Sequence, residues 1–460
     1  MTFFIWFFHH LLSIIVMLST LALVSKVLTQ RRAPGSTIAW LLGMVLIPYV
    51  GIPLFLLIGD RKIKRIAAQK NILYPRIKYG ETPAQITQVE RILLSSGVPP
   101  QTHTNHFEPL ETGEKAFATI LQGIQSAKST IHYTTFILGN DPVGRAILDA
   151  LCKKAREGIQ VRLLLDGIGS LWFPKARLKQ LTEAGGKYAL FVPLIRVPFS
   201  AHSNLRNHRK MVLIDGKEAI LGGMNSAADY MGPSPNKKRW TDFSFLIRGE
   251  ALKDFESLFK SDWTYASGEH LSPRQISGTP EGKTPLQVIA SGPDVPADPI
   301  YDALLTQIFS AKRRIWIATP YFIPDETLAR ALELACRRDI DVRILIPAHS
   351  NHFLADLCRG SYLKQVFHAG GHLCFFGPQM MHAKVTLIDD SFALIGSANL
   401  DMRSLLLNYE VSVLLSSEAS VKSIADWFET IFKHAHEAHP KNRWGSSFVD
   451  GIGRILGPML

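Results

Sequence analysis

Residues 381–410 read MHAKVTLIDDSFALIGSANLDMRSLLLNYE, and a near copy, NHRKMVLIDGKEAILGGMNSAAD, occupies residues 207–229. Each copy holds a histidine, a lysine two residues later, an aspartate five residues after that, and a Gly-x-x-Asn behind a short apolar run. These are His208, Lys210, Asp215 and Asn225 in the first copy, and His382, Lys384, Asp389 and Asn399 in the second. A lone His-x-Lys is typical of an ordinary surface pair, but two matching copies predict one site built from two halves of the chain.

Both copies have the sequence pattern of a β-hairpin. The apolar runs 211–214 and 385–388 are of the buried-strand type, and Asp-Gly and Asp-Asp turn signals end them. Because side chains two residues apart share a face of a strand, the histidine and lysine of each copy point the same way. Asp215 and Asp389 fall at the turns, where we expect them to hold the strand end or pair with a polar neighbour. The returning strand brings each asparagine to the histidine end of the sheet.

Together the two copies predict two imidazoles, two ammonium groups and two carboxamides around one point. One neutral histidine can attack while the other donates a proton, and the lysines and asparagines can hold a developing anion. A phosphodiester is the substrate that suits such a set. No carboxylate or cysteine cluster with metal-ligand spacing accompanies the motifs, so the sequence predicts chemistry without a metal or other cofactor.

The chain around the two motifs repeats in one order. In the first half we expect a helix over 117–127, a strand over 130–138, a helix over 143–157, a strand over 161–166 and a helix over 175–184. In the second half we expect a helix over 304–310, a strand over 315–319, a helix over 325–338, a strand over 342–347 and a helix ending at Gly370. This alternation predicts an α/β fold of two duplicated lobes, each an α/β/α sandwich, with a pseudo-two-fold interface that carries both motifs.

The sequence predicts four segments. They are a membrane hairpin over 1–60, a juxtamembrane connector over 61–115 with one short helix near 84–94, a first lobe over 116–275, and a second lobe over 286–460. The linker between the lobes is rich in Gly, Ser and Pro.

Two apolar runs without Asp, Glu, Lys or Arg, 3–25 and 33–59, open the chain. Each is long enough to cross a bilayer about 30 Å thick, so we expect a transmembrane helical hairpin. A secretory signal peptide is the competing interpretation, and it lacks a basic leading region here. Pro48, Gly51 and Pro53 leave open that the second run is kinked or re-entrant.

The charge pattern indicates anionic partners. Lys plus Arg number 51 against 39 Asp plus Glu, which gives a net charge of +12 in 460 residues. This balance fits lipid headgroups or nucleic acid. The cations after the second apolar run predict a patch that meets anionic lipid, or a solvated linker, and favour a cytoplasmic catalytic region; they are Arg61, Lys62, Lys64, Arg65 and Lys70.

The cysteines predict buried free thiols in a reducing compartment. They are Cys152, Cys336, Cys358 and Cys374, and none shows paired metal spacing. Cys152 and Cys336 occupy equivalent places in the repeat, so we do not expect a bridge between them.

The doubled motif resembles the phospholipase D superfamily and, within it, the bacterial cardiolipin synthases. The second motif matches through GSANLDMRS and on to Asn408 and Glu410. Other stretches similar to the family are RRAPGSTIAWLL at 31–42, LLLDGIGS at 163–170, RWTDF at 239–243 and TPYFIPD at 319–325. The resemblance covers nearly the whole chain.

The resemblance implies a membrane enzyme of the bacterial inner membrane that transfers a phosphatidyl group between two phosphatidylglycerol molecules, giving cardiolipin and glycerol. His208 would attack phosphorus to form a phosphohistidine, and His382 would protonate the leaving alcohol, although the near symmetry of the motifs leaves the two roles exchangeable. Asp215, Asp389 and Glu410 are candidates for setting the histidines' protonation. The expected partners are phosphatidylglycerol, other anionic phospholipids and the bilayer.

Three other functions remain open. A hydrolytic phospholipase D would differ only in letting water attack the intermediate. A phosphodiesterase acting on nucleic acid would share the motifs, but no array of base-stacking aromatic residues is evident and a membrane hairpin suits it poorly, so nucleic acid is not an expected partner. A non-catalytic membrane scaffold would be expected to have lost part of one motif, and both are intact.

Overall fold

The computed structural model describes residues 2–29, 34–58, 70, 73–74, 86–192, 205–271, 280–438, 451 and 453. The chain divides into two compact units, one of Met1–Ile63 with Leu194–Leu205 and one of Lys64–Pro193 with Arg206–Leu460. We call them the N-terminal unit and the catalytic unit. The cations predicted at 61–65 lie outside the described residues.

The N-terminal unit contains three helices, α1 (Thr2–Thr29), α2 (Pro34–Leu46) and α3 (Pro48–Ile58). Val27, Met44 and Phe55 form a small buried cluster where they pack together. The second apolar run divides at Ile47, and α3 starts at Pro48, since the first helical turn tolerates a residue without an N–H. No helix within the described residues combines the length and the hydropathy needed to cross a bilayer. The membrane hairpin therefore stays a prediction.

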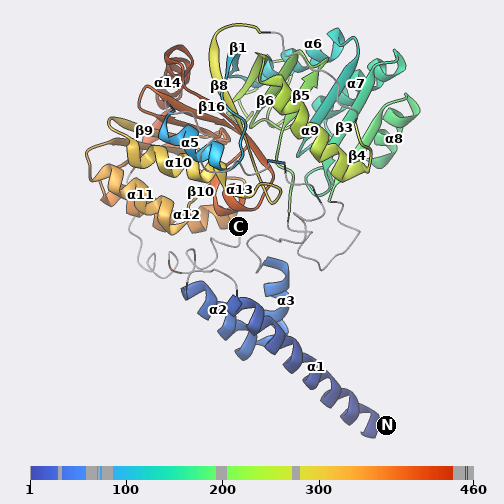
Figure 1. Cartoon of the computed structure of the whole chain (residues 1–460), viewed down its shortest axis with the longest axis vertical. Helices are drawn as coiled ribbons and strands as arrows, with labels where there is room; N and C mark the ends of the chain where they lie inside the picture. Colours follow the sequence, from blue (N-terminus) through green and yellow to red (C-terminus); the bar gives the residue numbers. More distant parts are fainter. Residues whose placement is uncertain are drawn as a thin grey trace. The chain divides into compact units, whose positions relative to one another are not determined.

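The catalytic unit is built on one 15-stranded sheet with helices along it (Figure 1). In residues 86–271 the elements are α5 (Gln88–Ser95), β1 (Thr102–Leu110), α6 (Gly113–Ser126), β2 (Thr130–Thr135), α7 (Pro142–Arg156), β3 (Gln160–Asp166), α8 (Lys175–Glu183), β4 (Lys187–Phe191), β5 (Met211–Ile214), β6 (Glu218–Gly222), β7 (Ser244–Gly249) and α9 (Leu252–Ser267).

The second half of this unit, residues 280–438, adds a similar series. Its elements are β8 (Thr284–Ser291), α10 (Pro299–Ser310), β9 (Arg314–Ala318), β10 (Phe322–Ile323), α11 (Glu326–Cys336), β11 (Asp341–Pro347), α12 (Phe353–His368), β12 (His372–Phe376), β13 (Val385–Ile388), β14 (Phe392–Gly396), β15 (Leu400–Asp401), α13 (Met402–Leu406), β16 (Glu410–Leu415), α14 (Glu418–Phe432) and β17 (Ala435–Glu437). β10 and β15 form a separate two-stranded sheet.

The strand order is the same from either side of the main sheet toward its middle. One side runs β4-β3-β2-β5-β6-β7-β1, and the other runs β12-β11-β9-β13-β14-β16-β8 with β17 added at the edge. β1 and β8 are far apart in the sequence but pair antiparallel and lie side by side at the centre (Figure 1). Equivalent strands of the two halves therefore lie at equivalent distances from the middle.

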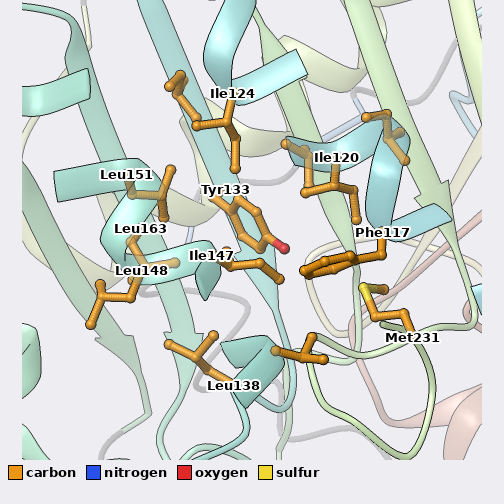
Figure 2. Close-up of a cluster of buried hydrophobic side chains, with 14 of the residues drawn as sticks. Phe117, Ile120, Ile124, Tyr133, Leu138, Ile147, Leu148, Leu151, Leu163 and Met231 are labelled. Atoms are coloured by element: carbon orange, nitrogen blue, oxygen red, sulfur yellow. The ribbon is translucent and has the colours of Figure 1, made fainter. Parts of the chain in front are cut away.

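Helices cover both faces of the first half. Ile131 and Tyr133 of β2 pack in a large apolar core with side chains of α6 and α7 (Figure 2). His132, between them, stacks on Phe259 of α9 with 4.3 Å between ring centroids. Because successive side chains of a strand point to opposite faces, α9 covers the face that α6 and α7 leave open.

The predicted alternation of helices and strands is confirmed within a few residues at each end. The short helix predicted near 84–94 is α5, which a capping box between Thr87 and Glu90 begins. The predicted connector also contains β1, which was not expected. The two halves share one continuous sheet, which joins them through the pairing of β1 with β8. All four cysteines are buried free thiols, as expected.

Candidate active site

Each motif histidine is held by backbone from the other half of the catalytic unit. The N–H of His208 donates to the carbonyl of Tyr409 at 2.9 Å, beside a parallel bridge between Asn207 and Tyr409. The N–H of His382 donates to the carbonyl of Thr241 at 2.7 Å, beside an equivalent bridge between Thr241 and Met381. These crossed bridges fix the histidine backbones at the contact between the halves.

A carboxylate from the opposite half contacts the Nδ1 atom of each histidine. Nδ1 of His208 lies 3.0 Å from Oε1 of Glu410, and Nδ1 of His382 lies 2.6 Å from Oδ2 of Asp242. All four side chains are buried. Since a carboxylate engages Nδ1 in both rings, Nε2 is the nitrogen that can face a substrate, and in His382 it lies 3.2 Å from Nζ of Lys384.

Asp242 was missed by the sequence reasoning, although the stretch RWTDF that contains it was noted. It precedes Ser244 by two residues, just as Glu410 precedes Ser412. The two serines are equivalent, because Gly222 pairs with Ser244 and Gly396 pairs with Ser412. Comparing the strands that follow the two hairpins would have revealed the second carboxylate.

The two lysines lie beside their histidines, as the strand spacing predicted. Nζ of Lys210 donates to the carbonyl of His208 at 2.7 Å, and Nζ of Lys384 lies 2.6 Å from Nδ1 of His382. Burial lowers the pKa of Lys210 to about 7, although the charge of Glu410 opposes it. Burial also lowers the pKa of Lys384 to about 8. Both ammonium groups are therefore held in a low-dielectric site, where an anion would bind strongly.

Burial lowers the pKa of both histidines. For His208 the charge of Glu410 opposes this effect, whereas for His382 the charges of Lys384, Lys210 and His208 add to it. The charge of His208 is thus one of the causes that lower the pKa of His382. Burial raises the pKa of Asp242 to about 6, against the attraction of Lys384.

Aromatic rings and further polar groups fix the two imidazoles. Phe136 meets the ring of His208 edge-on at 5.0 Å, and Tyr230 meets that of His382 edge-on at 5.0 Å. Ser397 donates its hydroxyl to Glu410. Rigid packing of this kind keeps reacting nitrogens in one orientation.

The asparagines of the motifs lie in the same region but engage neighbouring protein groups. Oδ1 of Asn225 accepts the N–H of Ile137 at 3.2 Å. The Asn399 side chain forms a hydrogen bond with Asp401, and its Oδ1 has no hydrogen-bond partner among the described residues. Asn399 thus keeps a buried side-chain oxygen without a hydrogen bond among the described residues.

Asp215 and Asp389 lie at the other ends of β5 and β13 from the histidines. Roughly 20 Å of extended backbone separates each aspartate from its histidine. Asp215 accepts from the backbone of Lys128, Ser129 and Thr130, and Asp389 accepts from that of Lys312, Arg313 and Arg314. Both therefore hold a strand end, as their place at the turn indicated. The carboxylates that contact the imidazoles are instead Glu410 and Asp242.

A buried cluster of charged side chains surrounds Arg209, the residue after His208. Nη1 of Arg209 lies 2.6 Å from Asp262, and Nζ of Lys70 lies 2.5 Å from Asp262 and 2.6 Å from Asp294. Asn207 also donates to Asp262, at 3.1 Å. Lys70 was predicted among the cations of a lipid-facing patch or solvated linker, and that prediction is wrong because its side chain is 1% exposed and fully paired.

The described residues contain no group of three His, Cys, Asp or Glu side chains arranged to hold a metal ion.

Two models of known protein families match most of the chain. The family model described as cardiolipin synthase, phospholipase D-like domain, matches twice, at residues 120–263 and 304–432. The model described as phospholipase D-nuclease N-terminal matches residues 17–59.

Curated relatives match over almost their full length. Cardiolipin synthase 1 of Bacillus anthracis is 34% identical over 94% of this chain and 90% of its own. Cardiolipin synthase of Alkalihalophilus pseudofirmus is 32% identical over 98% of this chain and 94% of its own. Among solved structures, the phosphatidylserine synthase of Haemophilus influenzae Rd KW20 has a similar fold, with a TM-score of 0.60, 17% identity and coverage of 81% of this chain and 99% of that one. The chain belongs to the cardiolipin synthase family of phospholipase D-like enzymes.

Proposed function

We propose that this enzyme transfers a phosphatidyl group from one phosphatidylglycerol molecule to another, giving cardiolipin and glycerol, through a phosphohistidine. The observation that carries the proposal is the pair of buried histidines, each with Nδ1 on a carboxylate of the opposite half and with two lysines beside them. The names of the relatives that match over 90% or more of their length support the same activity.

In the first step Nε2 of His208 attacks the phosphorus of the donor. The bond from phosphorus to the glycerol oxygen breaks, and protonated His382 gives its proton to that oxygen. Lys210 and Lys384 hold the negative charge that builds on the non-bridging oxygens. Glu410 holds the Nδ1 proton of His208, so that Nε2 carries the attacking lone pair.

In the second step the acceptor's hydroxyl gives its proton to His382 and its oxygen attacks the phosphohistidine. The bond between nitrogen and phosphorus breaks as the new phosphodiester forms. One phosphodiester is thus exchanged for another, and its free energy of hydrolysis is conserved. Bound substrate helps His382 to act as an acid, because the phosphodiester anion offsets the two ammonium charges that lower the pKa of His382.

The two lobes are proposed to descend from one duplicated unit, with the active site at their pseudo-two-fold interface. The repeated strand order and the two matches of one family model support this. Asp242 and Glu410 are equivalent in the repeat, so each lobe supplies the histidine for one pair and the carboxylate for the other.

The N-terminal unit is proposed to anchor the enzyme in the bacterial inner membrane, with the catalytic unit on the cytoplasmic side. Large apolar side chains stand exposed along α1, including Phe4 at 70% and Trp6 at 60%, as suits a helix among lipids. Protease protection of the full chain in right-side-out and inverted vesicles tests the orientation: digestion of the catalytic unit in inverted vesicles alone is the expected result.

The activity is tested with the purified full chain in vesicles of labelled phosphatidylglycerol. We expect cardiolipin and glycerol in equal amounts, and loss of more than about 1,000-fold in rate for both His208→Ala and His382→Ala. Phosphatidic acid as the main product would indicate hydrolysis. His382→Ala quenched in denaturing detergent at alkaline pH should retain the phosphorus label on the protein as an alkali-stable, acid-labile adduct, whereas His208→Ala should retain none.

A further inference from the structure

Exposed large apolar side chains of the catalytic unit gather in two loops. Among its described residues they are Ile168, Leu171, Trp172, Phe309, Phe353 and Leu354. All but Phe309 lie in residues 167–174 or at 353–354. Trp172 is 85% exposed and Phe353 is 78% exposed, so both side chains stand in solvent almost as in an extended chain. Large apolar patches on the surface of a protein usually mark a site where another protein or a membrane binds.

The two loops occupy equivalent places in the repeat. Residues 167–174 follow β3, and residues 348–354 follow β11. β3 lies between β2 and β4, and β11 lies between β9 and β12, with all these pairings parallel. We call the two segments, 167–174 and 348–354, the paired loops; the second includes Phe353 and Leu354, the first two residues of α12. Each segment therefore stands at the carboxyl-end edge of the parallel strands of its own half.

The same edge carries the active site. Thr134, near the carboxyl end of β2, pairs with Met211, and His208 and Lys210 come just before Met211. In the other half Ala318, at the end of β9, pairs with Val385, just after Lys384. In each half the reacting groups therefore lie at the strand ends from which the loop of that half projects, and the crossed contacts of the two histidines with Glu410 and Asp242 join these two regions.

Direct bonds connect the first loop to the active site. Asp166 accepts the N–H groups of Ile168 and Asn207, at 2.9 Å and 3.0 Å. Ser170 donates to the carbonyl of Phe136, whose ring meets His208. Gly169 permits this close approach, since a Cβ there would lie 2.3 Å from the Phe136 carbonyl oxygen. Trp172 is thus held on a braced loop beside His208.

The charge near the loops favours an anionic surface. Residues 167–182 contain Lys175, Arg177 and Lys179 and no Asp or Glu. Residues 348–355 contain two histidines and no Asp or Glu. The first segment, an apolar tip followed by cations, matches the boundary between acyl chains and anionic headgroups, and the second adds an apolar tip without acidic neighbours.

We propose that the paired loops form one membrane-docking surface, which dips into the headgroup region of a bilayer containing anionic phospholipid and brings the active site to its substrate. This rests on the proposed function to the extent that the substrate is a phospholipid. We favour a lipid bilayer over a protein as the partner of this surface. The surface consists of two separate loops, and both project near a site that converts phospholipids. A chain anchored by its N-terminal unit still requires such a surface, because an anchor does not orient the active site.

Site-specific probes test the depth of the loops in the full chain reconstituted into vesicles. An environment-sensitive fluorophore is attached at Trp172→Cys, Phe353→Cys or Phe309→Cys in turn. Labelling will be selective because the four native cysteines are buried and burial raises the pKa of each thiol. Phe309 is the matched control: it is 51% exposed and lies at the end of α10, just before β9 and so at the opposite end of β9 from Lys384.

We expect lipid with brominated acyl chains to quench the probes at 172 and 353, and aqueous iodide to quench the probe at 309. Equal iodide quenching at all three positions overturns the proposal. Probes at 172 and 353 that are shielded from iodide but not quenched by brominated lipid would indicate a protein partner, and would also overturn it. These readouts do not depend on catalysis, so they hold even where no cardiolipin forms.

An activity comparison separates docking from chemistry. The variant Trp172→Ala with Phe353→Ala should convert phosphatidylglycerol in bilayers about 10-fold more slowly than the unmodified enzyme. It should convert dispersed short-chain phosphatidylglycerol at the unmodified rate, whereas Phe309→Ala should change neither. Equal losses on both substrates would mean that the loops only support the fold, and would contradict docking. If the unmodified enzyme forms no product from bilayer phosphatidylglycerol and none from the dispersed substrate, the result would instead count against the proposed function.

Discussion

At the scale of single residues, the carboxylate on Nδ1 decides what each histidine can do. Glu410 sets the tautomer of His208, and its charge raises the pKa that burial lowers. The variant Glu410→Gln keeps the shape of the side chain and removes that charge. We expect a rate loss of about 100-fold or more, together with an acid limb of the pH–rate profile shifted to lower pH, since His208 would lose its proton more readily. Glu183→Gln, in an exposed pair with Lys179, is the control. A lower rate with an unmoved profile would show that Glu410 only supports the fold.

Lys210 illustrates a conflict between stability and function. Burial lowers its pKa from 10.5 to about 7, so between these pH values the unfolded chain binds the proton and the native one does not. Stability from this group therefore rises with pH from about 7 to about 10. Lys210→Met should lose more than about 100-fold in rate, remove that part of the pH dependence, and gain about 1 kcal/mol in stability at pH 7. Thermal unfolding of the detergent-solubilised full chain and of the variant, from about pH 7 to about pH 10, measures this difference in stability. A variant less stable than the unmodified enzyme at pH 7 would contradict this account.

Sequence reasoning found the histidines and lysines of the site because strand spacing alone puts His-x-Lys on one face. It found Glu410 through its match to the family. It missed Asp242, since the contact between Asp242 and His382 joins residues 140 positions apart. Local periodicity carries no information on a pairing between the two halves.

At the scale of the elements, Asp215 closes the turn between β5 and β6 onto the start of β2. Burial alone would raise the pKa of Asp215, but the N–H groups of Thr130, Lys128 and Ser129 outweigh it and lower the pKa below its ordinary value. The stability that this carboxylate contributes is therefore present above pH ~4 and is lost as the pH falls through the lowered pKa.

Asp215→Ala should accordingly destabilise the protein by about 2 kcal/mol at pH 7 and leave the rate per folded molecule within about 2-fold. Asp389→Ala, which removes the equivalent contacts with Lys312, Arg313 and Arg314, should cost a similar amount. Chemical denaturation and rates normalised to folded protein are the measurements. A rate loss of 100-fold in either variant would show that these aspartates act on the chemistry.

Among the elements that the sequence did not predict is β1, within the predicted connector. Its residues, THTNHFEPL, show no clean alternation and include a proline, so the pattern favours a connector. The strand forms because β7 and β8 supply partners on both sides, with Asn105 donating to the carbonyl of Thr284 at 3.0 Å. Tertiary pairing overrides weak local preference here. The pairing of β1 with β8 also joins the strands of the two halves into one sheet.

At the scale of the whole molecule, the buried charge cluster joins the segment before the sheet to the centre of the catalytic unit. Arg209, between His208 and Lys210, donates to the backbone carbonyls of Glu410 and Ser291, both at 3.1 Å. Lys70 neutralises the same carboxylates that hold Arg209. The cluster therefore connects the first described residue after the N-terminal helices with both lobes.

Removing one cation from this cluster leaves a buried carboxylate without full compensation. We expect Lys70→Met to destabilise the full chain by about 3 kcal/mol or more, because a broken buried pair costs far more than an exposed one. The rate should also fall, since Asp262 holds Asn207 next to His208. Lys179→Met, which breaks an exposed pair with Glu183, should change stability by less than about 0.5 kcal/mol.

Restoring charge balance should rescue part of that loss. In the double variant Lys70→Met with Asp294→Asn the cluster again holds one cation and one carboxylate, so we expect at least about half of the lost stability to return. Thermal unfolding of the two single variants and the double variant in the same detergent gives the coupling energy. If the double variant loses the sum of the two single losses, Lys70 and Asp294 are not coupled. The cluster would then stabilise the lobes, but the position of Lys70 would not affect that of His208.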